Sequence, residues 1–184
     1  MKITVITGSP HQQGTSSYLA DQFILGAEEC GHEVFRFDAA FKRVHPCLGC
    51  ERCGVSGNCA QQDDMTDLLP CLLDADMVLL VTPLYFFGLS AQLKTVVDRF
   101  YPLKDILKER SKKAALFVTA HGSDERNMAS VVAQYQTLVK YLRWEDTGMI
   151  LACGVGARSE IEASDYGDRA YQMGKAYPSL TADE

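Results

Sequence analysis

The sequence has few positive charges and no long apolar run, and these two deficits exclude several classes of protein. Its 18 Lys and Arg residues are outnumbered by 24 Asp and Glu residues, which gives a net charge of −6 at pH 7. This excess of negative charge argues against nucleic acid or an anionic membrane as the main partner. No apolar run is long enough to cross a bilayer, so we expect no membrane-spanning segment.

The N-terminus has neither the apolar block nor the cleavage site of a signal peptide, because Met1-Lys2 leads directly into a strand-like run. We therefore expect a cytoplasmic protein. The cytoplasm is reducing and disfavours disulfides, so the seven Cys residues need another explanation. With 184 residues, of which 47% are hydrophobic, the chain is expected to form a single domain over 1–184.

The first loop of the chain, 7–17, lacks both common nucleotide-binding motifs. It lies between a predicted buried strand at 1–6 and a predicted helix at 15–30. The loop contains neither Gly-Lys-Ser/Thr nor G-x-G-x-x-G. Its backbone N–H groups and the positive end of the helix dipole nevertheless favour an anion. The hydroxyl groups of this loop, with no lysine among them, suit a monophosphate ligand. The alternative is a helix N-terminus that binds no ligand and has Thr15 or Ser16 as its N-cap.

The rest of the chain alternates strands and helices. Apolar runs predict further strands at 33–38, 77–82, 114–119 and 147–153. Helical periodicity predicts helices at 91–101, capped by Ser90, at 128–142 and at 161–176, and a short helix opens at 63–67 with Pro70 expected in its first turn. This order predicts an α/β fold with an open five-stranded parallel sheet and helices on both faces. In such sheets ligands bind at the carboxyl ends of the strands, so the loops after the first, third and fourth strands are expected to converge.

Two of these loops have the composition expected around a flat, apolar ring. Residues 83–88 include three adjacent aromatic side chains at 85–87, and Gly88 permits close approach of the backbone. Three adjacent side chains cannot all face one ring, so at least one aromatic is expected in the core or at a subunit interface. Residues 119–123 offer a small-residue edge with His121 as a hydrogen-bond donor, or else His121 is simply a solvated loop residue.

These stretches together resemble the NAD(P)H-dependent FMN reductase branch of the flavodoxin-like proteins. The resemblance rests on Thr7-Gly8-Ser9-Pro10, Gly14-Thr15-Ser16, Pro83-Leu84-Tyr85-Phe86-Phe87-Gly88-Leu89-Ser90-Ala91-Gln92-Leu93-Lys94 and Asp98-Arg99. It implies noncovalent FMN, with the phosphate in the 9–17 loop and the ring between the 83–88 and 119–122 loops. The cofactor-binding residues that it implies are Ser9, His11, Gly14, Thr15, Ser16, Ser17, Pro83, Leu84, Tyr85, Phe86, Gly88, Thr119, His121 and Gly122.

Two residues depart from the family pattern. His11 stands where relatives often carry Arg, and Thr15 stands where they often carry Asn. Each keeps a hydrogen-bonding group but loses reach or charge, so a weaker phosphate site is expected. No residue is assigned a catalytic role, because hydride transfer from a nicotinamide to a flavin needs no protein acid or base.

Four of the cysteines crowd into the insertion loop 39–62. Cys47, Cys50, Cys53 and Cys59 have a C-x2-C-x2-C-x5-C spacing that resembles the iron–sulfur flavoproteins of the same branch. That resemblance implies a [4Fe–4S] cluster ligated by these four thiolates, and the spacing is of the cluster type. Two alternatives stay open: a zinc site, which usually has two separated Cys pairs, and a loop without metal, as in cluster-free relatives. The remaining three cysteines, at 30, 71 and 153, are expected to be buried or half-buried.

The resemblance implies an FMN-dependent NAD(P)H oxidoreductase that passes electrons to a small-molecule or protein acceptor, either directly or through the cluster. It also implies a homodimer or a homotetramer. The alternatives are a flavodoxin-like carrier that exchanges electrons with ferredoxin-type partners, a sensor in which the clustered cysteines are thiol switches, and a fold of this type without flavin.

Overall fold

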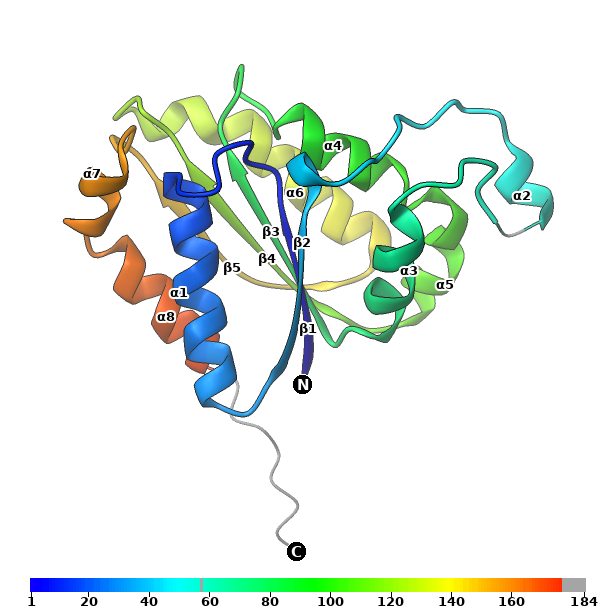
Figure 1. Cartoon of the computed structure of the whole chain (residues 1–184), viewed down its shortest axis with the longest axis horizontal. Helices are drawn as coiled ribbons and strands as arrows, with labels where there is room; N and C mark the ends of the chain where they lie inside the picture. Colours follow the sequence, from blue (N-terminus) through cyan, green and yellow to red (C-terminus); the bar gives the residue numbers. More distant parts are fainter. Residues whose placement is uncertain (57, 177–184) are drawn as a thin grey trace, which may run out of the picture.

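Five parallel strands form the central sheet of the protein (Figure 1). The computed structural model describes residues 1–56 and 58–176. The strands are β1 (Lys2–Thr7), β2 (Glu33–Asp38), β3 (Met77–Pro83), β4 (Lys113–Thr119) and β5 (Glu145–Ala152). Their spatial order is β2-β1-β3-β4-β5, and each neighbouring pair is parallel. This is the flavodoxin-like strand order, which confirms the predicted fold class.

The burial of each strand follows from its apolar pattern. The three central strands, β1, β3 and β4, are buried along nearly their whole length because helices cover both of their faces. The two edge strands alternate or are half-exposed, as the charged positions of 33–38 predicted. The strand order reverses between β1 and β3, which places the topological switch point beside the loop that follows β1.

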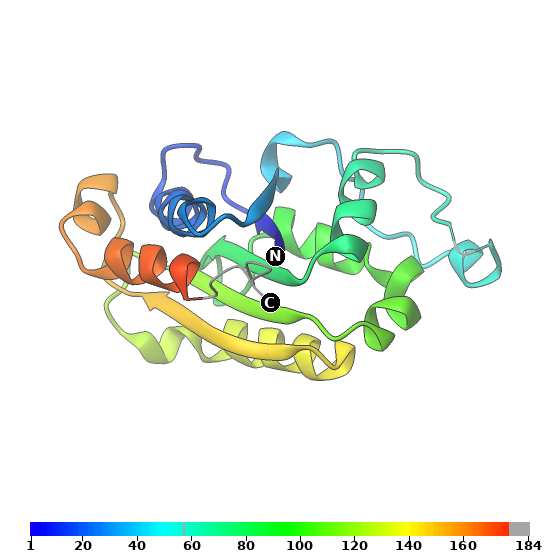
Figure 2. The same cartoon turned by 90° about the horizontal axis from the view of Figure 1, so that it is seen from below.

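Helices cover both faces of the sheet, as Figures 1 and 2 show for α1 (blue) and α6 (yellow). One face carries α1 (Thr15–Glu29), α7 (Arg158–Glu162) and α8 (Tyr166–Lys175), whose buried residues share a core with Val5, Leu79 and Phe117. The other face carries α3 (Met65–Asp74), α4 (Ala91–Asp98), α5 (Lys104–Glu109) and α6 (Ala129–Leu142). Short elements complete the described ranges: η1 (Ala39–Phe41), α2 (Arg52–Ser56), η2 (Tyr101–Leu103) and η3 (Glu125–Met128). In those ranges no helix has both the length and the apolar character that crossing a membrane requires.

Three local predictions were wrong. The helix predicted over 161–176 is two helices, because the Ser164 hydroxyl donates to the carbonyl of Ile161 and its oxygen accepts from the Tyr166 N–H, which starts a new helix. Pro70 lies inside α3 and not in its first turn. Buried Leu68 and Leu72 on either side of Pro70 hold this helix against the sheet. The helix predicted over 91–101 ends at Asp98 and continues as the separate turn η2, while its predicted N-cap, Ser90, is confirmed.

Helices α1 and α8 approach each other so closely that two glycines are required at the contact. A Cβ atom on Gly174 would lie 2.2 Å from the carbonyl oxygen of Phe23, and a Cβ on Gly26 would lie 2.2 Å from that of Tyr171. Both obstacles are backbone atoms, which cannot rotate away. The position of α8 on the sheet therefore depends on the absence of side chains at these two sites.

We expect Gly174→Ala to destabilise the protein by about 1–3 kcal/mol, because the two helices must move apart. A loss of stability would be informative, because replacing glycine by alanine inside a helix normally stabilises a protein by about 1 kcal/mol. Gly54→Ala is the matched control, because Gly54 also lies in a helix and an added Cβ would meet no atom within 4 Å. Urea unfolding measures both variants. A Gly174→Ala protein as stable as the wild type would show that the close contact is not required.

Candidate functional site

Three loops that are far apart in the sequence are hydrogen-bonded to one another at the carboxyl end of the sheet. The hydroxyl groups of Thr15 and Thr119 lie 3.0 Å apart and join the loop after β1 to the end of β4. The Leu84 N–H donates to the carbonyl of Thr119 at 2.8 Å, which joins the end of β3 to that of β4. The Ser90 hydroxyl donates to the carbonyl of Gly8 at 2.8 Å. The predicted convergence of the three loops is confirmed.

These loops enclose a cleft with a volume of about 780 Å³. Small-molecule sites usually measure roughly 300–1,000 Å³, so the cleft can hold a mononucleotide. We call the part of the cleft lined by the loop after β1 its polar end and the part lined by the loops after β3 and β4 its apolar end. Of the predicted cofactor residues, the cleft is lined by Ser9, His11, Gly14, Thr15, Ser16, Pro83, Leu84, Tyr85, Thr119 and His121.

Three of the other predicted residues face elsewhere. Ser17 is buried, and its hydroxyl oxygen accepts a hydrogen bond of 2.8 Å from Nη2 of Arg36, so its side chain is directed toward β2. Phe86 and Gly122 line a separate hollow of about 330 Å³ that adjoins the cleft and shares Leu84 with it. Gly88, the last of the predicted residues, lines neither space, and its backbone is hydrogen-bonded to that of Tyr85.

The polar end of the cleft is built around the first turn of α1. Gly14 occupies the N-cap position in an extended conformation and has no side chain to cap the helix, so neither Thr15 nor Ser16 is the N-cap. The first-turn N–H groups are then left for a ligand. The Gly14 N–H donates to the carbonyl of His11 at 3.0 Å, and the His11 N–H donates to the Ser9 hydroxyl at 3.1 Å, which orders the loop.

The aromatic loop is a strained hairpin. Tyr85 and Gly88 exchange backbone hydrogen bonds of 3.3 and 3.1 Å, and the two residues between them have φ angles of 45° at Phe86 and 64° at Phe87. Such two-residue turns normally contain Asn-Gly, since aromatic residues rarely adopt left-handed φ angles. None of the three aromatic side chains packs in the core, so of the two predicted locations only a subunit interface stays a prediction. The turn projects its tip outward, and Tyr85, Phe86 and Phe87 are 43%, 100% and 55% exposed.

The loop after β5 contributes to the cleft, and the sequence analysis missed it. Val155, Gly156 and Arg158 line the cleft, together with Phe41 from the turn after β2. The Arg158 guanidinium lies 4.5 Å from the centre of the Tyr18 ring, and its Nε donates to the Glu162 carboxylate at 2.5 Å. The sequence could have predicted this contribution, because the loop after every parallel strand of the sheet lies at the same edge.

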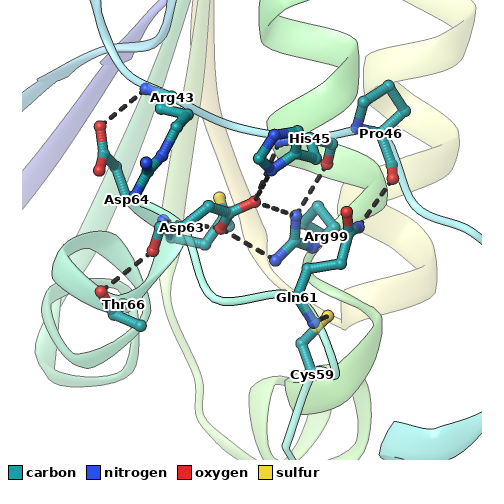
Figure 3. Close-up of polar contacts among 10 residues, drawn as sticks. Arg43, His45, Pro46, Cys59, Gln61, Asp63, Asp64, Thr66 and Arg99 are labelled. Atoms are coloured by element: carbon teal, nitrogen blue, oxygen red, sulfur yellow. Dashed lines mark hydrogen bonds and ion pairs between the residues drawn. The ribbon is translucent and has the colours of Figure 1, made fainter.

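A second group of residues joins the two ends of the cysteine-rich loop to α4 (Figure 3). Arg99 follows the last residue of α4, and its Nη1 and Nη2 atoms donate to the two carboxylate oxygens of Asp63 at 2.7 and 3.0 Å. Nη1 also donates to the carbonyl of His45 at 2.7 Å, while the His45 N–H donates to Asp63 at 3.0 Å. Both charged side chains are buried, with Arg99 2% and Asp63 4% exposed.

Further hydrogen bonds join the two ends of this loop. The Arg43 N–H donates to the Asp64 carboxylate at 2.7 Å, and the Asp64 N–H donates to the carbonyl of Arg43 at 3.0 Å. The Gln61 side-chain amide donates to the carbonyl of Pro46 at 2.8 Å (Figure 3). The chain that contains the four clustered cysteines thus leaves and returns at one place beside α4.

The buried ion pair changes the pKa of both partners. Burial alone would raise the pKa of Asp63, but the Arg99 guanidinium and the N–H groups of His45 and Met65 together bring it below its usual value. Burial alone would lower the pKa of Arg99, but the Asp63 carboxylate and, to a smaller extent, Cys59 bring it above its usual value. Both groups are therefore charged at neutral pH.

The four clustered cysteines line one cavity of about 260 Å³, and Arg99 and Tyr101 line it with them. All seven cysteines are unpaired, and the three outside the cluster are half-buried as predicted. Among the described residues, no three Cys, His, Asp or Glu side chains converge closely enough to hold a metal ion. The predicted ligands thus share a cavity, but they are not arranged around a single point.

Comparison with known proteins identifies the family. The NADPH-dependent FMN reductase family matches residues 1–152. An iron–sulfur flavoprotein of Methanocaldococcus jannaschii is 33% identical over 134 residues, which cover 71% of this chain and 69% of that protein. An iron–sulfur flavoprotein of Archaeoglobus fulgidus is 36% identical over 102 residues, 55% of this chain, and the match spans about half (46%) of that longer protein.

A solved structure of a flavone reductase has the same fold, with a TM-score of 0.74 at 20% identity over 95% of this chain and 61% of that one. The fold and the cleft define a flavodoxin-like protein with a nucleotide-sized site at its switch point. The chain belongs to the NADPH-dependent FMN reductase family.

The Asp63–Arg99 pair predicts a specific response to acid. Because the pKa of Asp63 is lower in the folded protein than in the unfolded chain, its stabilising effect is complete above about pH 4 and is lost as the pH falls through the folded-state value. We expect Asp63→Asn to destabilise the protein by about 3–5 kcal/mol near pH 7, because it leaves Arg99 buried without a counter-charge. This difference should shrink below about pH 4.

Urea unfolding at several pH values measures the difference. Asp67→Asn is the matched control, because the Asp67 side chain lies on α3 and is 60% exposed. The control should change the free energy of unfolding by less than about 0.5 kcal/mol at every pH. An Asp63→Asn effect that does not vary with pH would contradict the assignment.

Proposed function

We propose that the protein is an FMN-dependent NAD(P)H oxidoreductase that passes electrons to a small-molecule or protein acceptor. The observation that carries the proposal is the cleft of about 780 Å³, in which a hydroxyl-rich helix N-terminus and an apolar loop meet at the switch point of the sheet. Membership of the NADPH-dependent FMN reductase family supports the same cofactor and the same donor. When bound, the flavin accepts a hydride and releases electrons singly or in pairs.

The polar end of the cleft would hold the phosphate. The hydroxyl groups of Ser9, Thr15 and Ser16 and the first-turn N–H groups of α1 are hydrogen-bond donors beside the positive end of the helix dipole. Arg158 and His11 also line the cleft, and the Arg158 guanidinium is paired with Glu162. This set of donors suits one phosphate group.

The apolar end of the cleft would hold the flavin ring. Pro83, Leu84 and Tyr85 form one wall, and the small edge from Thr119 to His121 forms the other. The ring face near the exposed Tyr85 would receive the nicotinamide and then the acceptor. Phe86 and Phe87 present apolar area beside this opening, which supports association into a homodimer or homotetramer.

We further propose that Cys47, Cys50, Cys53 and Cys59 ligate a [4Fe–4S] cluster. Their donor set fits this group, because four thiol groups from one loop line a single, mostly apolar cavity that also contains the buried cation Arg99. Two relatives of this chain are named iron–sulfur flavoproteins. A bound cluster supplies one-electron transfer next to the two-electron chemistry of the flavin. Seven unpaired cysteines also suit a cytoplasmic location, because that compartment is reducing.

The donor is tested by mixing the FMN-loaded protein with NADPH or NADH in the absence of oxygen. We expect rapid loss of the flavin absorbance in the visible range, because a ring held beside the exposed Tyr85 would be accessible to a nicotinamide. A protein that is reduced only by dithionite or a reduced ferredoxin would contradict the proposal and indicate an electron carrier. A colourless protein that does not bind added FMN would contradict the cleft assignment as well.

The phosphate site is tested by Ser16→Asp, which places a carboxylate where the phosphate would lie. We expect the Kd for FMN to rise by a factor on the order of 10–100, or about 1.4–2.8 kcal/mol. Ser17→Ala is the matched control, because the neighbouring Ser17 hydroxyl faces Arg36 and is not part of the cleft. Fluorescence titration with FMN measures both. Equal affinities of Ser16→Asp and the wild type would place the phosphate elsewhere.

A further inference from the structure

One polar atom of the buried Arg99 side chain is not used by the contacts described above. Nη1 and Nη2 donate to Asp63 and to the carbonyl of His45. In the part of the chain that the structure describes, the buried Nε atom of Arg99 has no hydrogen-bond partner. An unpaired N–H group on a buried, charged side chain is costly, so its retention calls for an acceptor beyond the contacts described above.

The location of Arg99 indicates which acceptor this is. Arg99 lines the same cavity as the four clustered cysteines, and the Cys59 side chain raises the pKa of Arg99 both by its charge and as a hydrogen-bonding neighbour. Thiolate and sulfide ligands of an iron–sulfur centre carry negative charge, and hydrogen bonds to these sulfur atoms are one of the means by which proteins set the reduction potential. A charged N–H donor makes a stronger hydrogen bond than a neutral one.

We propose that Arg99 is a positioning residue for the iron–sulfur centre, with its Nε–H donating to a sulfur atom of that centre and thereby favouring the reduced state. The inference rests on the proposed function, since it requires a cluster on Cys47, Cys50, Cys53 and Cys59. Asp63 holds the guanidinium in a fixed orientation through two hydrogen bonds. Because Asp63 also neutralises the positive charge of Arg99, we expect the directed Nε–H group to affect the reduction potential of the cluster more than the net charge does.

This distinction determines the choice of variant. Arg99→Lys keeps a positive charge beside Asp63, so it preserves a buried ion pair, but it removes the Nε donor and the fork-shaped geometry. Arg43→Gln is the matched control, because it removes a guanidinium that is exposed and lies in the same segment beside Asp64. If charge alone set the potential, the control would have the larger effect.

The experiment uses the full chain, loaded without oxygen with iron, sulfide and FMN, and follows cluster reduction by electron paramagnetic resonance at controlled potential. We expect Arg99→Lys to retain FMN and to lower the ratio of reduced to oxidised cluster at a fixed potential at least tenfold, which is 59 mV for one electron. Arg43→Gln should change this ratio by less than about threefold, or roughly 30 mV. Cys50→Ser should lose iron and sulfide but keep FMN.

The outcomes separate this inference from the proposed function. A wild-type protein that binds neither iron nor sulfide, or that binds zinc instead, would overturn the cluster assignment and the role of Arg99 with it. A wild-type cluster whose potential is the same in Arg99→Lys would overturn the role of Arg99 alone. If Arg99→Lys does not fold, the double variant Arg99→Met with Asp63→Asn leaves no buried charge, and it should show the same tenfold shift; an unchanged ratio there would overturn the inference.

Discussion

The arrangement of the second site depends on one buried ion pair, between Asp63 and Arg99. Placing two charges in a protein interior is unfavourable unless good geometry and further hydrogen bonds offset the loss of hydration. Here Asp63 accepts both Nη groups of Arg99 and the His45 N–H, while Arg99 also donates to the His45 carbonyl. These contacts join His45 near the start of the cysteine-rich loop, Asp63 just after it and Arg99 at the end of α4. Val44, just before His45, packs against the hydrophobic core, whereas Leu48 further into the loop is 72% exposed.

Helix α4 connects this pair to the cleft. At its N-terminus the Ser90 hydroxyl donates to the carbonyl of Gly8, in the loop after β1, and accepts from the Leu93 N–H. A Cβ atom on Gly8 would lie 2.3 Å from that hydroxyl, so the loop and the helix are in direct contact. Arg99 lies nine residues further along, or about 13 Å at 1.5 Å per residue. One short rigid element therefore sets the distance between the two candidate sites.

The general layout followed from the sequence, and the orientation of single side chains did not. Buried apolar runs separated by helices specify a parallel sheet, and a parallel sheet brings its loops together at one edge. Whether a particular side chain enters the cleft depends on competing partners elsewhere, as for Ser17, which Arg36 of β2 draws away. Phe86 was misplaced because its orientation depends on a turn type that its sequence disfavours. The Asp63–Arg99 pair joins residues 36 positions apart and leaves no local pattern.

The two candidate sites differ in what holds them together, and this difference has a consequence for function. The cleft is formed by loops that begin at buried central strands, so its shape is maintained by the hydrophobic core on both faces of the sheet. The ends of the loop around the cysteine cavity are joined by polar contacts, and among the described residues its four thiol groups are not arranged around one point. Binding a metal centre would supply the missing order there, since ligation couples to local folding. The hydrophobic core of the domain does not need a metal centre to form. Loss of that centre would therefore leave the sheet and the cleft intact.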